Sequence, residues 1–593
     1  MREFDKIRKE ILSREKGTTI KSSYQLRVAL GFPNKYEVGI ANLGFQSIYK
    51  ILNQIEGVSC ERIFLFDYKP QDKVRTLESG DPLNFFQVIS FSVPFELDYL
   101  NILKILKQAK IPLLKKERDE SHPLLLAGGV AVTLNPEVMA PFFDAIFIGE
   151  AEEGIIEIAE ILKSYGSAFG KSAEKNYNKK KLLLDLAKVK GVYVPEFYEP
   201  VYDDKGLSEF GSVGLKKFKI EKGFPRKIER RKTDIGKIET YSSIVTPLSH
   251  FKNMFIVETE RGCAWKCRFC AVGQVYKPFR FHKKEKIISE IEKYNQGTNS
   301  IGLLGSMVSD LPFLEELCSE LNQKGYEIGI SSLRVDKITP NLLDILIKSG
   351  LKTLTLAPEA GTERMWKIID KRIEREDVLN AVRLAKEKNL EKLKLYFIIG
   401  LPFEKREDIQ GIVDLIKEIH GIFVGATRWV AHDVGTALVA VREKNVGETR
   451  PSTLLRIKEI ILSINPFVPK PFTPFQWAPM DSEKSLREKL KIISDGIRGL
   501  KGIKFEKKSI KEAILQGILS QGNRKVGMGI YYHIKENLPL SQAFRKAEVD
   551  VEFFAFKEKA KDYLFPWEVV EMGIGKESLF KNIVLCLRFY TVN

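Results

Sequence analysis

Cysteine is scarce in this sequence, and it contains no long apolar runs. Six cysteines among 593 residues are too few for a disulfide framework, which is typical of small chains dense in cysteine. No run of about 18 apolar residues is available to span a membrane. The N-terminal stretch, MREFDKIRKEILSREK, is charged throughout and lacks the apolar core of a signal peptide. We therefore expect a cytoplasmic protein without a membrane partner.

The chain is too long for a single hydrophobic core. Its length predicts about three to five domains, and 44% apolar residues suffice to fill their interiors. Lys and Arg number 95 against 78 Asp and Glu, which leaves a net charge of +17. A basic excess is typical of proteins that bind RNA or other anions. Because the lysines are scattered over predicted helices such as 104–116 and 283–293, a charged surface of the thermophile type is the alternative.

Three of the six cysteines stand together in the segment 258–280, ETERGCAWKCRFCAVGQVYKPFR. Cys263, Cys267 and Cys270 have CxxxCxxC spacing and follow an apolar run, 254–257, that predicts a strand. Three thiolates on one tight loop can each hold one iron of a cubane iron-sulfur cluster, and no fourth cysteine lies nearby. The fourth iron would then keep an open position for a substrate.

Cysteines can also hold zinc or lie in the core as buried thiols. Structural zinc takes four N or S ligands, usually in two CxxC-like pairs. The nearby histidine, His282, lies twelve residues beyond the last loop cysteine and opens a predicted helix. Cys318 falls on the apolar side of a helical pattern, and Cys60 and Cys586 lie in or beside apolar segments. We interpret these last three as buried core thiols.

The cysteine segment resembles the radical S-adenosylmethionine (radical SAM) enzymes in its spacing, in the aromatic Phe269 and in the strand before it. The resemblance implies that the three cysteines hold a [4Fe-4S] cluster. It also implies that the amino and carboxylate groups of S-adenosylmethionine bind the fourth iron. An electron from a donor such as flavodoxin or ferredoxin would then cleave the sulfonium to a 5′-deoxyadenosyl radical.

Strand-like runs alternate with helical ones from about residue 24 to residue 165. The predicted strands are 26–32, 62–66, 87–91, 124–127 and 145–148, and the predicted helices are 43–55, 97–107 and 152–161. This alternation predicts a parallel, doubly wound sheet, which binds ligands beyond the carboxyl ends of its strands. Those ends carry Ser90, Ser92, Gly128 and Gly129, which are small enough for a ligand to approach the backbone closely.

Such a sheet ahead of a radical SAM core resembles the cobalamin-binding domain of the cobalamin-dependent radical SAM enzymes. A poorly characterised branch of that family is similar over about 26–574, on the segments GFPNKYEVGIANLGFQSIYKILN, VISFSVPFELDYLNIL, LLLAGGVAVTLNPEVMAPFFDAIFIGEAEEGI and SINPFVPKPFTPFQW.

The motif DxHxxG, whose histidine replaces the lower axial base of cobalamin, is absent. His122, the only histidine before His250, precedes a predicted strand and is not expected to be a ligand. Cobalamin would therefore bind without a histidine on its lower face. A domain that binds nothing, or binds a protein substrate, is the alternative.

After the cysteine loop, strands and helices alternate in six βα units, which predicts an open parallel barrel of the radical SAM type. The predicted strands are 255–258, 301–304, 327–335, 353–357, 393–399 and 460–466. Active sites of such barrels gather at the carboxyl ends of the strands. By position, Gly305, Ser306, Arg334, Glu359 and Gly400 are therefore expected to contact S-adenosylmethionine. A structural ion pair is the alternative for Arg334 and Glu359, and a strand-to-helix turn for Gly400.

The predicted organisation is an α/β chain. It comprises a doubly wound, cobalamin-binding-like Rossmann domain at 1–200, a linker at 201–250, a radical SAM partial (β/α)6 barrel at 251–480, and a mainly α C-terminal domain at 481–593. The segment 465–477, NPFVPKPFTPFQW, predicts a rigid extended track. It would either line the site or close over the barrel mouth.

The predicted function is cobalamin-dependent methylation of an unactivated carbon by radical SAM chemistry. One alternative is radical SAM modification of tRNA or ribosomal components without cobalamin. Another is a non-catalytic iron-sulfur factor that binds RNA or protein. The sequence does not identify the substrate, for which a protein, a peptide or RNA are the candidates.

Overall fold

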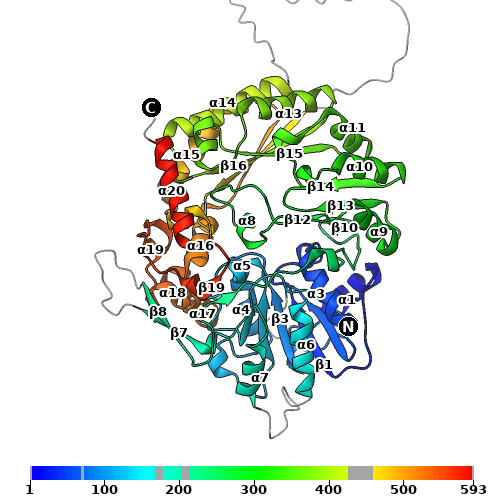
Figure 1. The fold of residues 1–593 in the computed structure, drawn as a ribbon, viewed down its shortest axis with the longest axis vertical. Coiled ribbons are helices and arrows are strands. Elements are labelled where there is room, and N and C mark those ends of the chain that lie inside the picture. The colour runs from blue at the N-terminus through cyan, green and yellow to red at the C-terminus, as the bar shows by residue number, and fades with distance from the viewer. Residues whose placement is uncertain (1–2, 68–71, 167–177, 203–213, 425–457, 591–593) are drawn as a thin grey trace, which may run out of the picture.

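The computed structural model describes residues 3–67, 72–166, 178–202, 214–424 and 458–590. An N-terminal sheet with its helices faces a barrel of parallel strands, and the C-terminal helices run along one side of both (Figure 1). Within the described residues no helix is long and apolar enough to cross a membrane.

The N-terminal sheet has the strand order β2-β1-β3-β4-β5-β6. Its strands are β1 Leu26–Gly31, β2 Val58–Ile63, β3 Val88–Ser92, β4 Leu124–Gly128, β5 Ala145–Phe147 and β6 Val192–Tyr193. The first five are parallel and β6 is antiparallel. This order has its switch point between β1 and β3, where doubly wound sheets bind ligands. The prediction of a doubly wound α/β domain is confirmed.

Helices cover both faces of this sheet. The connecting helices are α3 Leu43–Gln54, α4 Asp98–Gln108, α5 Val130–Leu134 and α6 Gly154–Ser164. Helix α3 contacts α6, whereas α4 contacts the C-terminal helix α17, Arg524–Glu536. Every residue of β1 and β2 is buried, as expected for a parallel sheet covered on both sides.

The barrel is built from two parallel sheets. The first contains β10 Met254–Glu258, β13 Ser300–Leu304 and β14 Glu327–Ile330, and the second contains β15 Thr353–Glu359, β16 Lys392–Ile399, β17 Glu459–Pro466 and β18 Ile503–Lys507. A parallel bridge between Leu333 and Leu356 joins them. The helices outside are α9 Lys284–Tyr294, α10 Leu314–Gln323, α11 Pro340–Lys348, α12 Glu363–Ile368, α13 Arg375–Glu387 and α14 Arg406–Phe423. The six predicted strands are present, and β18 adds a seventh.

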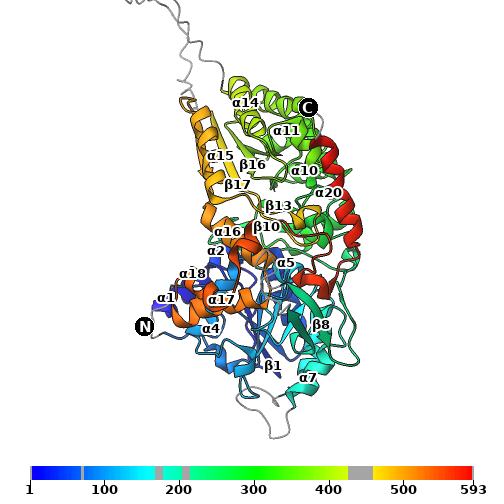
Figure 2. The same ribbon diagram turned by 90° about the vertical axis from the view of Figure 1, so that its left-hand side faces the viewer.

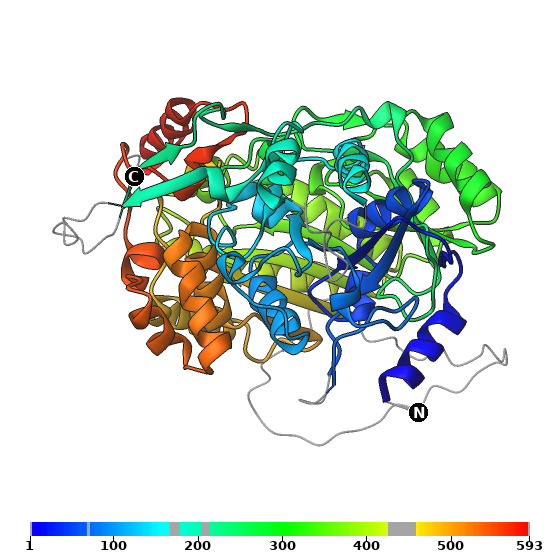
Figure 3. The ribbon, with the colours of Figure 1, turned by 90° about the horizontal axis from the view of Figure 1, so that it is seen from below.

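The region after β17 is mainly α-helical, as predicted. Its helices are α15 Glu483–Gly496, α16 Ile510–Gln521, α17, α18 Leu540–Lys546, α19 Val551–Phe556 and α20 Lys576–Tyr590. The side view shows α16 to α18 beside the N-terminal sheet and α20 beside the barrel (Figure 2), and from below the same helices flank the sheet (Figure 3). Arg524 of α17 makes an ion pair of 2.8 Å with the buried Glu137. Helix α20 contacts α12 of the barrel, so the C-terminal helices contact both of the other parts.

The proline- and aromatic-rich segment 465–477 is packed into the interior. Phe467, Phe475 and Trp477 are at most 3% exposed. The Trp477 ring lies edge-on to Phe565 and Phe580, with centroids 5.6 and 5.3 Å away. These contacts favour the closing strip over the substrate-lining track.

Candidate active site

The cysteine loop leaves the barrel at the end of β10 through a narrow neck. In this neck β11, Glu260–Arg261, pairs antiparallel with β12, Arg280–Phe281. The pairing closes residues 262–279 into a loop. Gly262 has a φ of +95°, and a Cβ there would meet the carbonyl oxygen of Tyr276 at 2.4 Å. Only glycine allows this close approach within the neck.

The three loop cysteines are free and partly accessible. Burial raises the pKa of the Cys263 thiol to about 12 and that of Cys267 to about 11, and it also raises the pKa of Cys270. Backbone N–H groups point at two of the sulfur atoms, from Trp265 to Cys263 and from Val272 to Cys270. A bound iron would take the place of the thiol protons. The donor set therefore fits an iron-sulfur cluster.

The zinc interpretation needs a fourth N or S ligand, for which His282 is the nearby candidate. His282 is buried, and its Nε2 lies 3.8 Å from a carboxylate oxygen of Glu258. Cys60, Cys318 and Cys586 are buried, as expected for core thiols.

Beside the cysteine loop, the carboxyl end of β13 meets the carboxylate of Glu260. The Met307 N–H donates a hydrogen bond to Glu260 Oε1, and a Cβ on Gly305 would collide with that carboxylate. The other oxygen, Oε2, is buried and has no hydrogen-bond partner in the described part of the chain. Burial raises the pKa of Glu260 to about 7.

Arg334 and Glu359 both lie beside the cysteine loop in ion pairs of their own. Arg334 pairs with Asp336 at 2.8 Å, and its guanidinium lies 3.7 Å from the ring centroid of Trp265. Glu359, at the end of β15, pairs with Lys371 at 3.3 Å. The structure thus shows the ion pairs, and contact with S-adenosylmethionine stays a prediction for both residues.

Gly400 and Phe269 have packing roles. Gly400, with a φ of +76°, donates its N–H to Glu404 at 2.7 Å and lies against Asp481 and Leu486, which fits a strand-to-helix turn. Phe269 packs against the barrel core. Their contact with a cofactor also stays a prediction.

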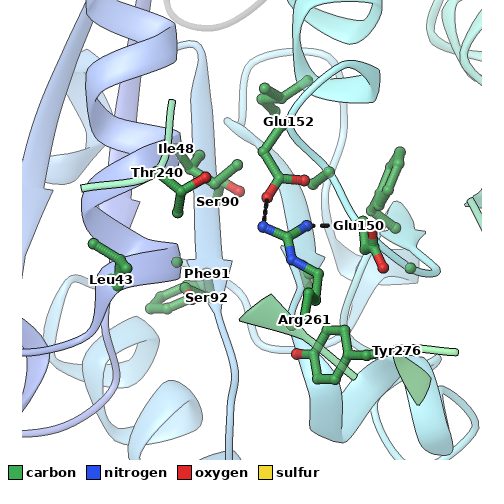
Figure 4. Close-up of a pocket in the computed structure, with 18 of the residues that line it drawn as sticks. Leu43, Ile48, Ser90, Phe91, Ser92, Glu150, Glu152, Thr240, Arg261 and Tyr276 are labelled. Carbon is green, nitrogen blue, oxygen red and sulfur yellow. Dashed lines mark hydrogen bonds and ion pairs between the residues drawn. The ribbon is translucent and has the colours of Figure 1, made fainter. Parts of the chain in front are cut away.

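A cavity of about 410 Å³ lies between the N-terminal sheet and the cysteine loop. Six of the predicted residues line it: Ser90, Ser92, Gly128, Gly129, Gly305 and Ser306. Arg261 and Tyr276 of the cysteine loop lie across the cavity from Ser90 and Ser92 (Figure 4). The carboxyl edge of the sheet and the loop that carries the cysteines therefore share one cavity, whose volume is typical of small-molecule sites.

Two family models match the chain over these same regions. Residues 257–416 match the radical SAM superfamily, and residues 44–195 match the N-terminal region of radical SAM proteins. This chain belongs to the radical SAM superfamily. The match begins at the end of β10 and covers the cysteine loop and the barrel strands through β16.

Several known proteins resemble this chain to different extents. An uncharacterised protein of Methanocaldococcus jannaschii is 28% identical over 525 residues, which are 88% of this chain and 94% of that protein. The ribosomal protein uS12 methylthiotransferase RimO of Thermodesulfovibrio yellowstonii is 23% identical over 222 residues, or 35% of this chain and 52% of that enzyme. Among solved structures, the radical SAM methyltransferase TsrM of Kitasatospora setae is 14% identical with a TM-score of 0.40, and covers 66% of this chain and 71% of its own.

An ionic network at the edge of the cavity joins this radical SAM barrel to the N-terminal sheet. Arg261 lies between Glu150 at 3.2 Å and Glu152 at 2.8 Å (Figure 4). It also pairs with Glu258 at 2.8 Å. Although burial alone would raise it, Arg261 holds the pKa of Glu258 at about 2. The network therefore keeps Glu258 ionised at the end of β10.

The residues of this network, together with Tyr276, were not predicted as site residues. Their only sequence signal is position, because Glu150 and Glu152 follow the last parallel strand of the sheet and Arg261 precedes the first cysteine. By contrast, His122 lies ahead of β4, where it pairs with Asp119 at 2.8 Å. That is the opposite edge of the sheet from the cavity.

Proposed function

We propose that this radical SAM chain binds cobalamin at the carboxyl edge of its N-terminal sheet and methylates an unactivated carbon. The supporting observation is the shared cavity, which has Gly128 and Gly129 on one side and the cysteine loop on the other. When bound, the [4Fe-4S] cluster supplies the electron that cleaves S-adenosylmethionine to a 5′-deoxyadenosyl radical, and cobalamin supplies the methyl group. An external donor such as a flavodoxin or ferredoxin would reduce the cluster.

The chain's own residues would bind and orient these groups. A Cβ at Gly128 would meet only Phe147, at 3.8 Å, so the backbone there is open to a close ligand. The partnerless Oε2 of Glu260 would accept a hydrogen bond from an ammonium group of S-adenosylmethionine. Leucine, isoleucine and phenylalanine side chains make much of the cavity wall and would keep water away from a radical.

Anaerobic reconstitution tests the proposal directly. The chain is loaded with iron, sulfide and hydroxocobalamin, and the retained metals are measured after gel filtration. We expect about four irons and about one cobalt per chain. A variant with all three loop cysteines replaced by alanine should keep cobalt and lose iron. Failure of the unaltered chain to retain cobalt would contradict methyl transfer from cobalamin but not the radical chemistry.

A second candidate is modification of a ribosomal component or tRNA without cobalamin. It is favoured by the likeness to the uS12 methylthiotransferase and by the net charge of +17. Cys60 is the only cysteine before the loop and is buried, so the N-terminal half offers no second cysteine trio for an auxiliary cluster. About eight irons per chain, in place of about four, would favour this candidate.

A non-catalytic iron-sulfur factor is the remaining alternative. Reductive cleavage of S-adenosylmethionine separates it from both enzymes. A cluster that only stabilises the fold should yield no 5′-deoxyadenosine even with a strong reductant, whereas either enzyme should yield it.

A further inference from the structure

Glu150 joins the two halves of the molecule through a single buried carboxylate. Its side chain is 1% exposed. The Arg280 guanidinium donates to both of its oxygens, at 2.6 and 3.0 Å, and Arg261 donates to Oε2 at 3.2 Å. The Thr233 N–H donates to the same oxygen at 2.9 Å. One carboxylate therefore accepts four hydrogen bonds from three separate segments.

Backbone contacts with Arg231 hold Glu150 in place independently of its side chain. Gly149, the second residue after β5, has a φ of +114°, and a Cβ there would collide with the backbone of Arg231. Gly149 forms a parallel bridge with Arg231, and the Glu150 N–H donates to the Arg231 carbonyl at 3.1 Å. Glycine lets the two backbones approach this closely, and the bridge holds Glu150 at the carboxyl edge of the sheet.

The two arginines that Glu150 binds are opposite each other in the neck of the cysteine loop. Arg261 of β11 is paired directly with Arg280 of β12, and the loop with its three cysteines runs between them. A group that holds both arginines therefore fixes the entrance and the exit of the loop together. The fork of hydrogen bonds from Arg280 fixes angle as well as distance.

A contribution to stability alone does not account for this arrangement. Glu150, Glu152 and Glu258 face Arg261 and Arg280, so three carboxylates share two guanidinium groups. One oxygen of Glu152 is buried without a partner among the described residues. Buried ion pairs often stabilise a fold no more than apolar residues of the same volume would. The directions of the hydrogen bonds in these ion pairs, in contrast, fix how the N-terminal sheet and the neck of the cysteine loop are placed against each other.

We propose that Glu150 is a positioning residue that holds the cysteine loop, and with it the iron-sulfur cluster, at a fixed place over the cavity of the N-terminal sheet. The proposal rests on the proposed function only for the identity of the ligand in that cavity. The attachment of the loop is independent of whether cobalamin binds.

The test compares Glu150→Gln with Glu153→Gln in the full chain carrying its cluster. Glu153 is a matched control because it lies on the same turn but is 41% exposed. It pairs with Arg231 and not with the two arginines of the neck. Hydrogen exchange is followed in peptides from the loop, 258–281, and from helix α10. Electron paramagnetic resonance of the reduced cluster is recorded with and without S-adenosylmethionine.

We expect Glu150→Gln to speed exchange in the loop peptides at least tenfold and to leave α10 unchanged. The resonance spectrum with S-adenosylmethionine should become heterogeneous, and Glu153→Gln should match the unaltered chain in both measurements. Unchanged loop exchange with an unchanged spectrum would overturn the proposal. Faster exchange throughout the chain would also overturn it, since Glu150 would then only stabilise the fold.

A second variant covers the case in which Glu150→Gln does not fold. Arg280→Lys keeps the charge of the neck but cannot donate the two parallel hydrogen bonds, and it should raise loop exchange by a smaller factor. Exchange at the level of the unaltered chain would overturn the proposal here as well. Neither measurement needs cobalamin. A chain that fails to retain cobalt but shows these loop effects therefore contradicts the proposed function alone.

Discussion

The buried carboxyl group of Glu260 should make the stability of the protein depend on pH. Burial, with a further contribution from the charge of Glu258, raises its pKa from 4.5 to about 7. One pKa unit corresponds to about 1.4 kcal/mol, so ionising Glu260 in the folded chain should cost up to about 3 kcal/mol. The folded state binds this proton more tightly than the unfolded state. The stabilisation is therefore complete below pH 4.5 and is lost as the pH rises through about 7.

Glu260→Gln removes the titrating group and keeps its size. The amide oxygen can still accept the hydrogen bond from the Met307 N–H, and the amide is neutral like the protonated acid. At pH 8.5 we expect the variant to be more stable by up to about 3 kcal/mol. At pH 5 the difference should be about 1 kcal/mol or less.

Differential scanning calorimetry of the cluster-free protein at both pH values measures the effect. For a cooperative unit of 150–250 residues, Tm moves by roughly 2–4 °C per kcal/mol, so the gain at pH 8.5 should be roughly 6–12 °C. The exposed Glu285 provides the control, because Glu285→Gln should show no difference between the two pH values. Equal shifts of Glu260→Gln at pH 5 and pH 8.5, or a lower Tm at pH 8.5, would refute the reasoning.

Three further predictions concern the cluster and the sheet edge. Cys267→Ala should abolish the iron content and visible absorbance of the reconstituted protein, whereas Cys318→Ala, at a fully buried thiol, should keep both; loss of iron from the second variant would contradict the assignment. Gly128→Leu should fill the cavity and weaken hydroxocobalamin binding at least tenfold without lowering Tm, because only one side chain lies near a Cβ there, at 3.8 Å; unchanged binding would place the ligand elsewhere. Gly129→Ala should instead lower the free energy of unfolding by about 1–3 kcal/mol in denaturant titrations, because its φ is +110° and a Cβ would press on the backbone of Val93.

Periodicity predicted most of the strands, and the departures from it have physical causes. The predicted strand at 62–66 begins four residues after the start of β2, Val58–Ile63. The polar residues of VSCERI obscured it, because Arg62 can be buried only through ion pairs with Glu15 and Glu78. Those partners lie outside any local window. Strand β18 was missed because it is short and half-exposed, and only pairing with β17 makes it a strand.

The candidate site was predictable where the geometry of parallel sheets decides it. Small residues after a strand must lie at the carboxyl edge, so Ser90 and Gly128 could be placed from the sequence alone. By the same rule Glu150 lies at that edge, but its contact with Arg261 could not be predicted, because it depends on which surfaces of two domains face each other. The sequence carries no pattern for such an interface when it is made of a few charged residues.

The charged interface also explains why both halves of the molecule are needed for one site. Contacts between apolar surfaces are non-directional, so an apolar interface would tolerate small shifts of one domain against the other. The fork from Arg280 to Glu150, at 2.6 and 3.0 Å, does not tolerate them, because its hydrogen bonds weaken steeply with angle. The neck of the cysteine loop is therefore held by the N-terminal domain, while the barrel supplies the strand that precedes it. The distance between the cysteines and the sheet edge is then set by both domains together.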